Sequence, residues 1–436
     1  MMRLDGDAVR RVQAAFEDNF VRDAEIGAEV CVWQDGREVL RFGGGWRDAA
    51  QTVPWTSDTL VLCWSATKGP AAACALHALQ EADIALDVPV SSVWPEFGTA
   101  GKERLTFAEL LAHRAGLAVL ETDGLDIFEL ETVAEALAGQ APNWEPGTAH
   151  GYAPRTFGYL LDAVVRRTAG MSLGDYWRKV FGNPLALSFW IGLPDEWQSH
   201  VARMHAARVG DLKEPGPFEH ALADKSSLTA RSFARPAGIT GAAATNRPEV
   251  WRAALPSFGG IGNARSLARF YDRVAVGEFF RGAWREALTR RISNGPDLVL
   301  RQPTAFAAGF MMDPLDASGA KLRATFGPSP RAFGHPGAGG SLAFADPENR
   351  IGFAYVMNRM ENGVLREARP ARLVQALYGV RVFADDRQNR NFRNPHAGPR
   401  QLRDHRRGGA DSPRVRPPGR HRHGFRPPHQ RQPGHL

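Results

Sequence analysis

Ser65 and Lys68 stand three residues apart in the stretch LCWSATKGPAAACALHAL (62–79), where an apolar, alanine-rich segment begins. Residues i and i+3 lie on one face of a helix, so the Lys68 amine can reach the Ser65 hydroxyl. A serine hydroxyl is a poor nucleophile until a base takes its proton, and a lysine in a partly dry cleft can lose its charge. The pair therefore predicts a serine nucleophile with a lysine partner. The alternative is that Ser65 caps a helix and Lys68 is solvated in its first turn.

The S-x-x-K spacing alone does not identify a nucleophile, because it occurs a second time. Ser318 and Lys321 repeat it within DPLDASGAKLRA (313–324). No apolar helix follows this turn-rich stretch, which we predict to be a hairpin loop. Cys63 lies two residues before Ser65 and has no charged sequence neighbour to lower its pKa. We therefore predict a buried structural thiol at Cys63 and not a nucleophile.

Two further stretches favour the catalytic interpretation of Ser65. Tyr152 comes just before a predicted helix. A phenol near an ammonium has its pKa lowered and can accept a proton, whereas its ordinary role at a helix entrance is packing. The stretch HPGAGG (335–340) interrupts two strand-like runs, and glycines there let a substrate approach the backbone. A backbone N–H of this stretch and that of Ser65 would form an oxyanion hole; the alternative is a glycine-rich hairpin.

The elements that must position these residues follow from apolar spacing and turn signals. Thr106 would cap one short helix and Gly116 would end it. Pro154 and Gly170 bound a clearer helix. The expected helices are 7–22, from Ser65 to about Ala85, 106–117, 154–170, from 264 onward, and about 365–378.

Strand signals lie near both ends of the chain. The sequence AEVCVWQDGREVLRF (28–42) predicts a hairpin that turns at Asp35-Gly36. Residues 195–250 are irregular, and we expect a long surface excursion around a cleft. Antiparallel strands are expected at 305–312, 331–335, 341–346 and 351–357.

The simplest assembly pairs the early hairpin with the late strands in one sheet. The middle of the chain then forms a helical subdomain over one side, and a cleft lies where the two meet. We therefore predict one domain over 1–383, with an α/β part at about 1–80 and 257–383. The helical part would cover about 81–256, and a separate tail would cover 384–436.

Composition is that of a globular protein. The chain has 436 residues, of which 43% are hydrophobic and 23% are charged. Three cysteines without a C-x-x-C pair argue against a disulfide framework or a zinc site. The start, MMRLDGDAVRRVQAAF, has no signal-peptide run, and no segment approaches the roughly 18 apolar residues of a membrane helix. We therefore expect a cytoplasmic protein without a membrane partner.

The basic character belongs to the tail. The whole chain has a net charge of +7, but residues 384–436 contain 13 Arg against 4 Asp, so the preceding residues carry −2. The tail has eight prolines and few large apolar residues, which predicts disorder. No aromatic platform accompanies its charge, so we do not expect nucleic-acid binding. The abrupt change of composition is also what a frameshifted end would produce.

Several stretches together resemble the serine β-lactamase/penicillin-binding-protein superfamily, and most closely its family VIII carboxylesterases. The resemblance implies an α+β fold with an antiparallel sheet flanked by helices, an all-helical subdomain, and an active site between them. We expect neither a metal nor a cofactor. The stretches are WSATK (64–68), LLAHRAGL (110–117), YAPRTFGYLL (152–161), GGIGNARSLARFY (259–271) and FGHPGAGGSLAFADPENRIGFAYVMNRM (333–360).

The resemblance also implies roles for single residues. Ser65 would be the acylated nucleophile and Lys68 its hydrogen-bonded partner. Tyr152 would act as general base and then as general acid. His335, with Pro336 and Gly337, would occupy the K-T-G position of the family. The N–H of Ala338 would be the second oxyanion donor.

Two departures from the family pattern bear on the substrate. Pro154 stands where β-lactamases of class C type have the asparagine of Tyr-x-Asn, and His335 replaces the K-T-G lysine. Both changes favour neutral esters over anionic β-lactams. We therefore predict a serine carboxylesterase acting on a small-molecule ester. The alternatives are a β-lactamase, DD-peptidase or acyltransferase with the same chemistry, and a non-catalytic binding protein. The sequence gives neither the natural ester nor the oligomeric state.

Overall fold

The computed structural model describes residues 2–208, 214–363, 365 and 368–379. The predicted tail, 384–436, lies outside the described residues, as does the predicted domain boundary at 383. The described part of the chain therefore contains every candidate site residue, and neither the expected disorder of the tail nor its origin is tested.

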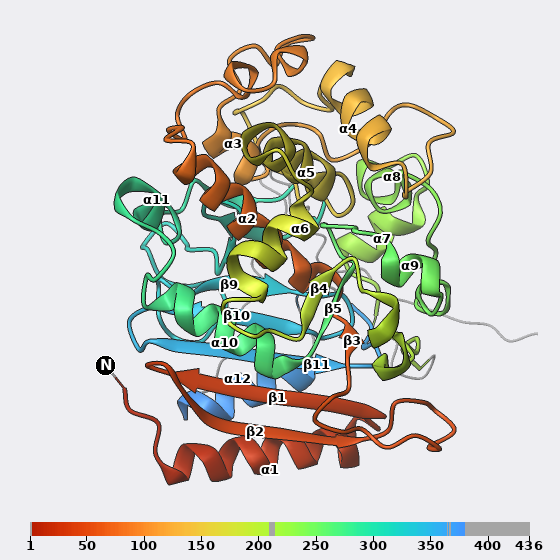
Figure 1. Ribbon diagram of the computed structural model, residues 1–436, viewed down its shortest axis with the longest axis vertical. Coiled ribbons are helices and arrows are strands. Elements are labelled where there is room, and N and C mark those ends of the chain that lie inside the picture. Colours follow the sequence, from red (N-terminus) through yellow and green to blue (C-terminus); the bar gives the residue numbers. More distant parts are fainter. Residues whose placement is uncertain (1, 209–213, 364, 366–367, 380–436) are drawn as a thin grey trace, which may run out of the picture. The chain divides into compact units, whose positions relative to one another are not determined.

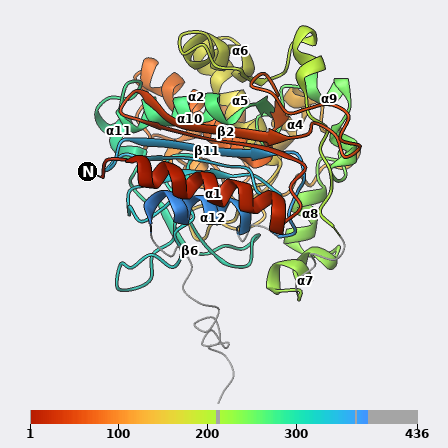
Figure 2. The same cartoon turned by 90° about the horizontal axis from the view of Figure 1, so that it is seen from below.

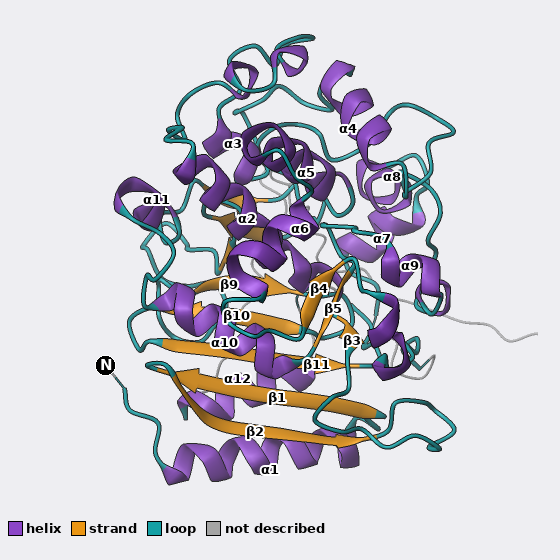
Figure 3. Ribbon diagram, in the orientation of Figure 1, coloured by secondary structure: helices purple, strands orange, loops and turns teal. Residues whose placement is uncertain are grey.

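An eight-stranded antiparallel sheet carries the fold (Figures 1 and 3). Its order is β2-β1-β11-β10-β9-β8-β7-β6, so the early hairpin pairs with the last strand. In this register Val30 lies opposite Tyr355, and the prediction that early and late strands share one sheet is confirmed. The strands are β1 (Gly27–Gln34), β2 (Arg37–Gly45), β6 (Ser293–Pro296), β7 (Pro303–Phe306), β8 (Met311–Met312), β9 (Phe333–Pro336), β10 (Leu342–Asp346) and β11 (Ile351–Met357).

Helices cover both faces of this sheet (Figure 2). On one face α1 (Gly6–Arg22) packs against α12 (Ala368–Tyr378). On the other face α10 (Ala264–Ala275) packs on β1, β10 and β11. A Cβ on Gly352 would lie 2.1 Å from the carbonyl oxygen of Ala268, so α10 sits directly on the backbone of β11. The predicted α+β class with a helix-flanked antiparallel sheet is confirmed.

The middle of the chain forms the helical part, which lies above the sheet in Figure 1. A small second sheet, β3-β5-β4, connects it to the rest: β3 (Val61–Leu62), β5 (Gly260–Gly262) and β4 (Phe189–Ile191). The remaining α-helices are α2 (Lys68–Glu81), α3 (Phe107–Leu111), α4 (Leu130–Gly139), α5 (Thr156–Ala169), α6 (Leu173–Trp177), α7 (Pro217–Ala223), α8 (Leu228–Ala234), α9 (Pro248–Arg252) and α11 (Gly282–Ala287). Short 3-10 or π turns are η1 (Trp64–Thr67), η2 (Val90–Ser92), η3 (Pro95–Phe97), η4 (Arg178–Gly182), η5 (Asp195–His200) and η7 (Ala243–Thr245).

Local signals placed some helix ends and missed others. Thr106 caps α3 as predicted and forms a capping box with Glu109, and Gly170 closes α5 with a left-handed φ of +68°. The prediction that Gly116 ends the 106–117 helix is wrong, because α3 already ends at Leu111. His113 adopts a φ of +58°, which an α-helix cannot accommodate.

Two stretches differ from their predicted form because the elements are short. Residues 195–250 include α7, α8 and α9, each of seven residues or fewer, which is too short for apolar periodicity to reveal. The single strand expected at 305–312 is a tight hairpin of β7 and β8. Its turn passes through Gly309 at a φ of +85°.

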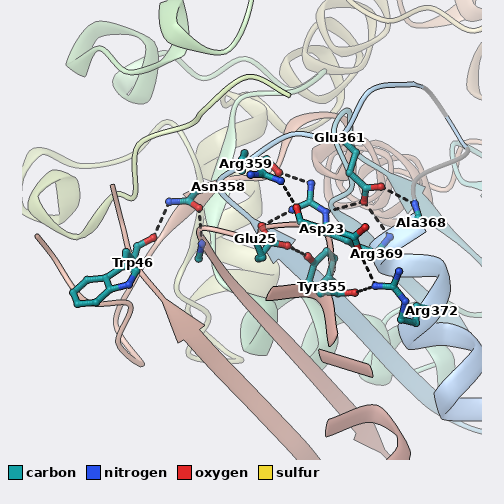
Figure 4. Close-up of polar contacts among 12 residues, drawn as sticks. Asp23, Glu25, Trp46, Tyr355, Asn358, Arg359, Glu361, Ala368, Arg369 and Arg372 are labelled. Atoms are coloured by element: carbon teal, nitrogen blue, oxygen red, sulfur yellow. Dashed lines mark hydrogen bonds and ion pairs between the residues drawn. The ribbon is translucent and has the colours of Figure 1, made fainter. Parts of the chain in front are cut away.

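A buried ion-pair network fastens α12 to the start of the sheet (Figure 4). The side chains of Arg369 and Glu25 are fully buried and paired. Arg369 also donates to Glu361 at 2.9 Å and to the carbonyl oxygen of Arg359 at 2.6 Å. The Tyr355 hydroxyl, from β11, donates to Glu25. The network thus joins the last helix, the last strand and the segment before β1.

None of the helices in the described part of the chain combines the length and the apolar character needed to cross a membrane.

Candidate active site

The candidate nucleophile lies in a tight turn between β3 and α2. Ser65 is in η1 and is partly exposed, whereas Lys68, the first residue of α2, is fully buried. The cap position of α2 belongs to Thr67, which makes no side-chain capping bond. The alternative of a serine cap with a solvated lysine is therefore wrong. The turn instead presents a serine at the surface over a lysine that is shielded from water.

Lys68 is held by two backbone carbonyl groups. Its Nζ donates to the oxygens of Pro154 and Ser257, each at 2.8 Å, and lies 3.5 Å from Ser65 Oγ. Burial lowers the pKa of Lys68 well below its ordinary value, which favours the neutral amine. A neutral amine has two N–H donors and one lone pair. Since the two carbonyls take both donors, the lone pair remains for the Ser65 proton.

Tyr152 completes the group. Its phenol is buried and hydrogen-bonded to Ser65, and Lys68 Nζ lies 4.8 Å from the centre of its ring. Burial is the largest influence on the Tyr152 pKa and raises it, while the Ser65 hydrogen bond lowers it. The expectation that an ammonium would lower the Tyr152 pKa is therefore wrong for this site. The physical reason is that burial disfavours both the phenolate and the Lys68 ammonium.

The glycine-rich stretch after β9 lies against the nucleophile turn. A Cβ on Gly337 would be 2.4 Å from the Cys63 carbonyl oxygen, so only glycine allows this approach. The Gly337 N–H donates to the Ser341 carbonyl at 2.5 Å and turns the chain back into β10. Within the described residues, the N–H groups of Ser65 and Ala338 have no hydrogen-bond acceptor. The stretch is thus a hairpin that packs against the nucleophile turn, and its Ala338 N–H is not used within the described residues.

His335 brings no positive charge to the site. Burial lowers its pKa to about 3, and Nδ1 lies 2.7 Å from the carbonyl oxygen of Pro336, to which it donates. Nε2 therefore carries a lone pair, and it has no hydrogen-bond partner in the described part of the chain. The centres of the His335 and Tyr152 rings are 5.7 Å apart. At neutral pH this position is uncharged, unlike the lysine of the family pattern.

The two competing sequence candidates are structural. Lys321 pairs with Asp313 at 2.8 Å, and Ser318 donates to Asp316 at 2.6 Å within the predicted hairpin loop. Cys63 is fully buried, and burial raises the pKa of its thiol to about 12. Both predictions are confirmed, since neither group combines exposure with an activating partner.

Sequence reasoning missed the groups that hold Lys68 and Tyr152. The Pro154 and Ser257 groups that bind Lys68 are backbone carbonyls, which every residue has, so residue type cannot predict these contacts. The Ser257 hydroxyl donates to the Arg155 carbonyl at 2.5 Å and accepts from the Gly158 N–H at 2.7 Å, which fixes this segment to the start of α5. Among the residues the structure describes, no group of three or more His, Cys, Asp or Glu side chains could hold a metal ion.

We expect Gly69→Ala to destabilise the protein and to displace Lys68. A Cβ at Gly69 would lie 1.9 Å from the hydroxyl oxygen of Tyr271, which is fully buried. Such overpacking costs about 1–3 kcal/mol of unfolding free energy. In the control Gly139→Ala the new methyl meets nothing within 4 Å, and we expect a gain of about 0.4–1 kcal/mol. Urea unfolding measures both, and equal stability of the two variants would contradict this packing.

Comparisons with known proteins extend over the whole described core. The family model described as Beta-lactamase matches residues 12–378. Esterase/beta-lactamase LipL of Mycobacterium tuberculosis is 30% identical over 369 residues, which cover 80% of this chain and 81% of the relative. The solved structure of a family VIII carboxylesterase is similar at a TM-score of 0.76 and 31% identity, covering 87% of this chain and 99% of that one. A penicillin-binding protein homologue from Caulobacter crescentus has a TM-score of 0.75 and 33% identity, with the same coverage of 87% and 99%.

Proposed function

This chain belongs to the β-lactamase family and is a hydrolase related to esterases. We propose that it is a serine carboxylesterase that acts through an acyl-enzyme on Ser65. One observation carries the proposal: a partly exposed serine lies 3.5 Å from the amine of a buried lysine, which also donates to two backbone carbonyls. The esterase and carboxylesterase names of the similar proteins support an ester as the substrate class.

Acylation begins with loss of the Ser65 proton. The neutral Lys68 amine takes this proton as Ser65 Oγ attacks the ester carbonyl carbon, which gives a tetrahedral oxyanion and a Lys68 ammonium. The N–H groups of Ser65 and Ala338 donate to the oxyanion, a contribution worth roughly 10²–10³ in rate per donor. The Pro154 and Ser257 carbonyls accept from the ammonium as they did from the amine.

Collapse of the oxyanion breaks the ester bond. The leaving alkoxide takes a proton from the Tyr152 phenol, and Tyr152 recovers a proton from Lys68, so alcohol departs and both side chains return to neutral. Because its pKa is raised, Tyr152 stays protonated until the leaving alkoxide forms. Water then attacks the acyl-enzyme, and its proton returns along the same groups to Ser65 as the carboxylic acid leaves.

The site favours uncharged substrates. His335 is neutral at pH 7, because its pKa is about 3, so it offers no cation to a substrate carboxylate. Pro154 has no side-chain amide to hold the amide of a β-lactam, and its carbonyl is already bonded to Lys68. Small neutral esters need neither group.

A substrate comparison tests the proposal. We expect turnover of short p-nitrophenyl esters, weak or no turnover of nitrocefin, and covalent labelling by a fluorophosphonate at Ser65. Efficient nitrocefin turnover without ester turnover would replace the esterase by a β-lactamase. Folded protein that neither labels nor turns over any ester would indicate a binding protein.

The pH profile of ester hydrolysis should have a single acid limb. Activity requires neutral Lys68, so kcat/KM rises as this ammonium loses its proton, at a pH well below its ordinary pKa of 10.5. No alkaline limb is expected up to about pH 10, because burial raises the Tyr152 pKa above its ordinary value of 10.0. Background-corrected rates measure this profile, and a loss of activity that begins near pH 8 would refute it.

A further inference from the structure

The loop that carries Tyr152 has three consecutive backbone N–H groups held by two residues of distant segments, one by a backbone carbonyl and two by side chains. The Gly151 N–H donates to the His113 carbonyl oxygen at 3.1 Å. The Tyr152 N–H donates to both carboxylate oxygens of Asp297, each at 3.1 Å. The Ala153 N–H donates to His113 Nδ1 at 3.2 Å. Asp297 therefore binds the amide of Tyr152 itself, and His113 binds the amides of the residues before and after it.

Hydrogen bonds within its own turn and from Thr304 fix the orientation of the Asp297 carboxylate. It is buried, and its Oδ1 also accepts from the N–H groups of Val299 and Leu300 at 2.8 Å each, which fixes the carboxylate in its own turn. Its Oδ2 accepts from the Thr304 hydroxyl at 2.8 Å. These donors satisfy the carboxylate, and no described residue forms a salt bridge with it, so its geometry is set by the β6–β7 connection.

His113 is equally constrained. Its Nδ1 accepts a hydrogen bond, so the ring is neutral with its proton on Nε2, and burial lowers its pKa far below the ordinary value. The ring packs against Phe157 and Phe306, with centres 4.2 Å and 4.4 Å apart. The centre of the Tyr152 ring lies 5.3 Å away. A residue with a φ of +58°, packed in this way, cannot turn without moving the loop.

We propose that His113 and Asp297 are positioning residues that hold the Tyr152 phenol at Ser65. The inference rests on the proposed function for its effect on catalysis, but the placement of Tyr152 can be measured without any substrate. Misplacement of a catalytic group by about 1 Å can cost about 10²-fold in rate. Loss of either side chain should therefore lower kcat and leave KM nearly unchanged, because each side chain binds the backbone of the loop that carries Tyr152.

Paired amide variants of His113 test the inference. Asn places its amide oxygen near the position of Nδ1 and tolerates a positive φ, whereas Gln extends to the position of Nε2. We expect His113→Asn to retain kcat within about fivefold and His113→Gln to lose about 10²-fold. Asp297→Asn keeps one oxygen for the Tyr152 N–H, and Asp297→Ala keeps none. We therefore expect Asp297→Ala to lose more kcat than Asp297→Asn. His220→Gln, exposed on α7, is the control.

A substrate-free measurement separates this inference from the proposed function. The chain has six tyrosines, so [¹³Cζ]tyrosine gives six NMR signals, and Tyr152→Phe identifies the one of interest. We expect the Tyr152 signal to move in His113→Gln and Asp297→Ala and to stay in the two Asn variants. An unmoved signal with wild-type kcat in both loss variants would overturn the inference, as would equal losses for His113→Asn and His113→Gln. If no ester is hydrolysed but the signal moves as expected, only the proposed function fails.

Discussion

Ser65→Ala should reduce ester hydrolysis by roughly 10⁴- to 10⁶-fold, because it removes the oxygen that attacks the substrate carbonyl. Water must then attack in place of Ser65, and the backbone donors can still bind the oxyanion. The Ser65 side chain is partly exposed and in a short turn, so the variant should keep the stability of the wild type. Steady-state kinetics on a p-nitrophenyl ester and intact-protein mass after fluorophosphonate treatment measure the two effects.

The matched control is Ser318→Ala, which alters the second S-x-x-K pair. Ser318 bonds to Asp316 in a hairpin loop, and Lys321 is paired with Asp313. We expect kcat/KM and labelling to equal those of the wild type. If Ser65→Ala retained more than a few per cent of the activity, or if the Ser318 variant lost it, the nucleophile would have to be sought elsewhere.

Arg369→Met should lower the free energy of unfolding by about 3–5 kcal/mol, because it leaves Glu25 buried without its cation. Both side chains are fully buried, and Arg369 also binds Glu361 and the Arg359 carbonyl (Figure 4). Burial already raises the pKa of Glu25, and Arg369 lowers it. Without Arg369 that pKa rises further. The penalty should therefore be smallest at acid pH, where Glu25 is protonated in both proteins, and should grow as pH rises.

Urea unfolding at two pH values measures this effect. Arg281→Met is the control, since its pair with Glu81 is largely exposed, with side chains 65% and 51% accessible, and such pairs contribute about 0–1 kcal/mol. A loss for Arg369→Met no larger than that of the control would show that the buried network does not fasten α12.

Much of the fold was predictable because its signals are local. Asp35-Gly36 marks the β1–β2 turn, Thr106 the start of α3 and Gly170 the end of α5. The shared sheet of early and late strands also followed, since the apolar strands had few other partners. The short helices between 195 and 250 were missed because five to seven residues make fewer than two helical turns.

The candidate site was predictable in its residues but not in its electrostatics. Ser65, Lys68 and Tyr152 were named from their types and neighbours, and they lie together. The lowered pKa of Lys68 comes from its complete burial, and the two carbonyl groups that accept its hydrogen bonds lie 86 and 189 positions away in sequence. The contact of Asp297 with the Tyr152 amide likewise spans 145 positions. Contacts of this kind follow from tertiary packing, which no local pattern encodes.

The pairing of β1 with β11 has a consequence for the chain as it is synthesised. The Gly27 N–H bonds to the side chain of Asn358, 331 residues later. At about 5–20 residues per second, a ribosome delivers β11 tens of seconds after β1 has emerged. Until then the inner edge of the first hairpin is unpaired and free to join another chain. We therefore expect a nascent or prematurely terminated product that ends before Ile351 to aggregate more readily than a chain that includes β11.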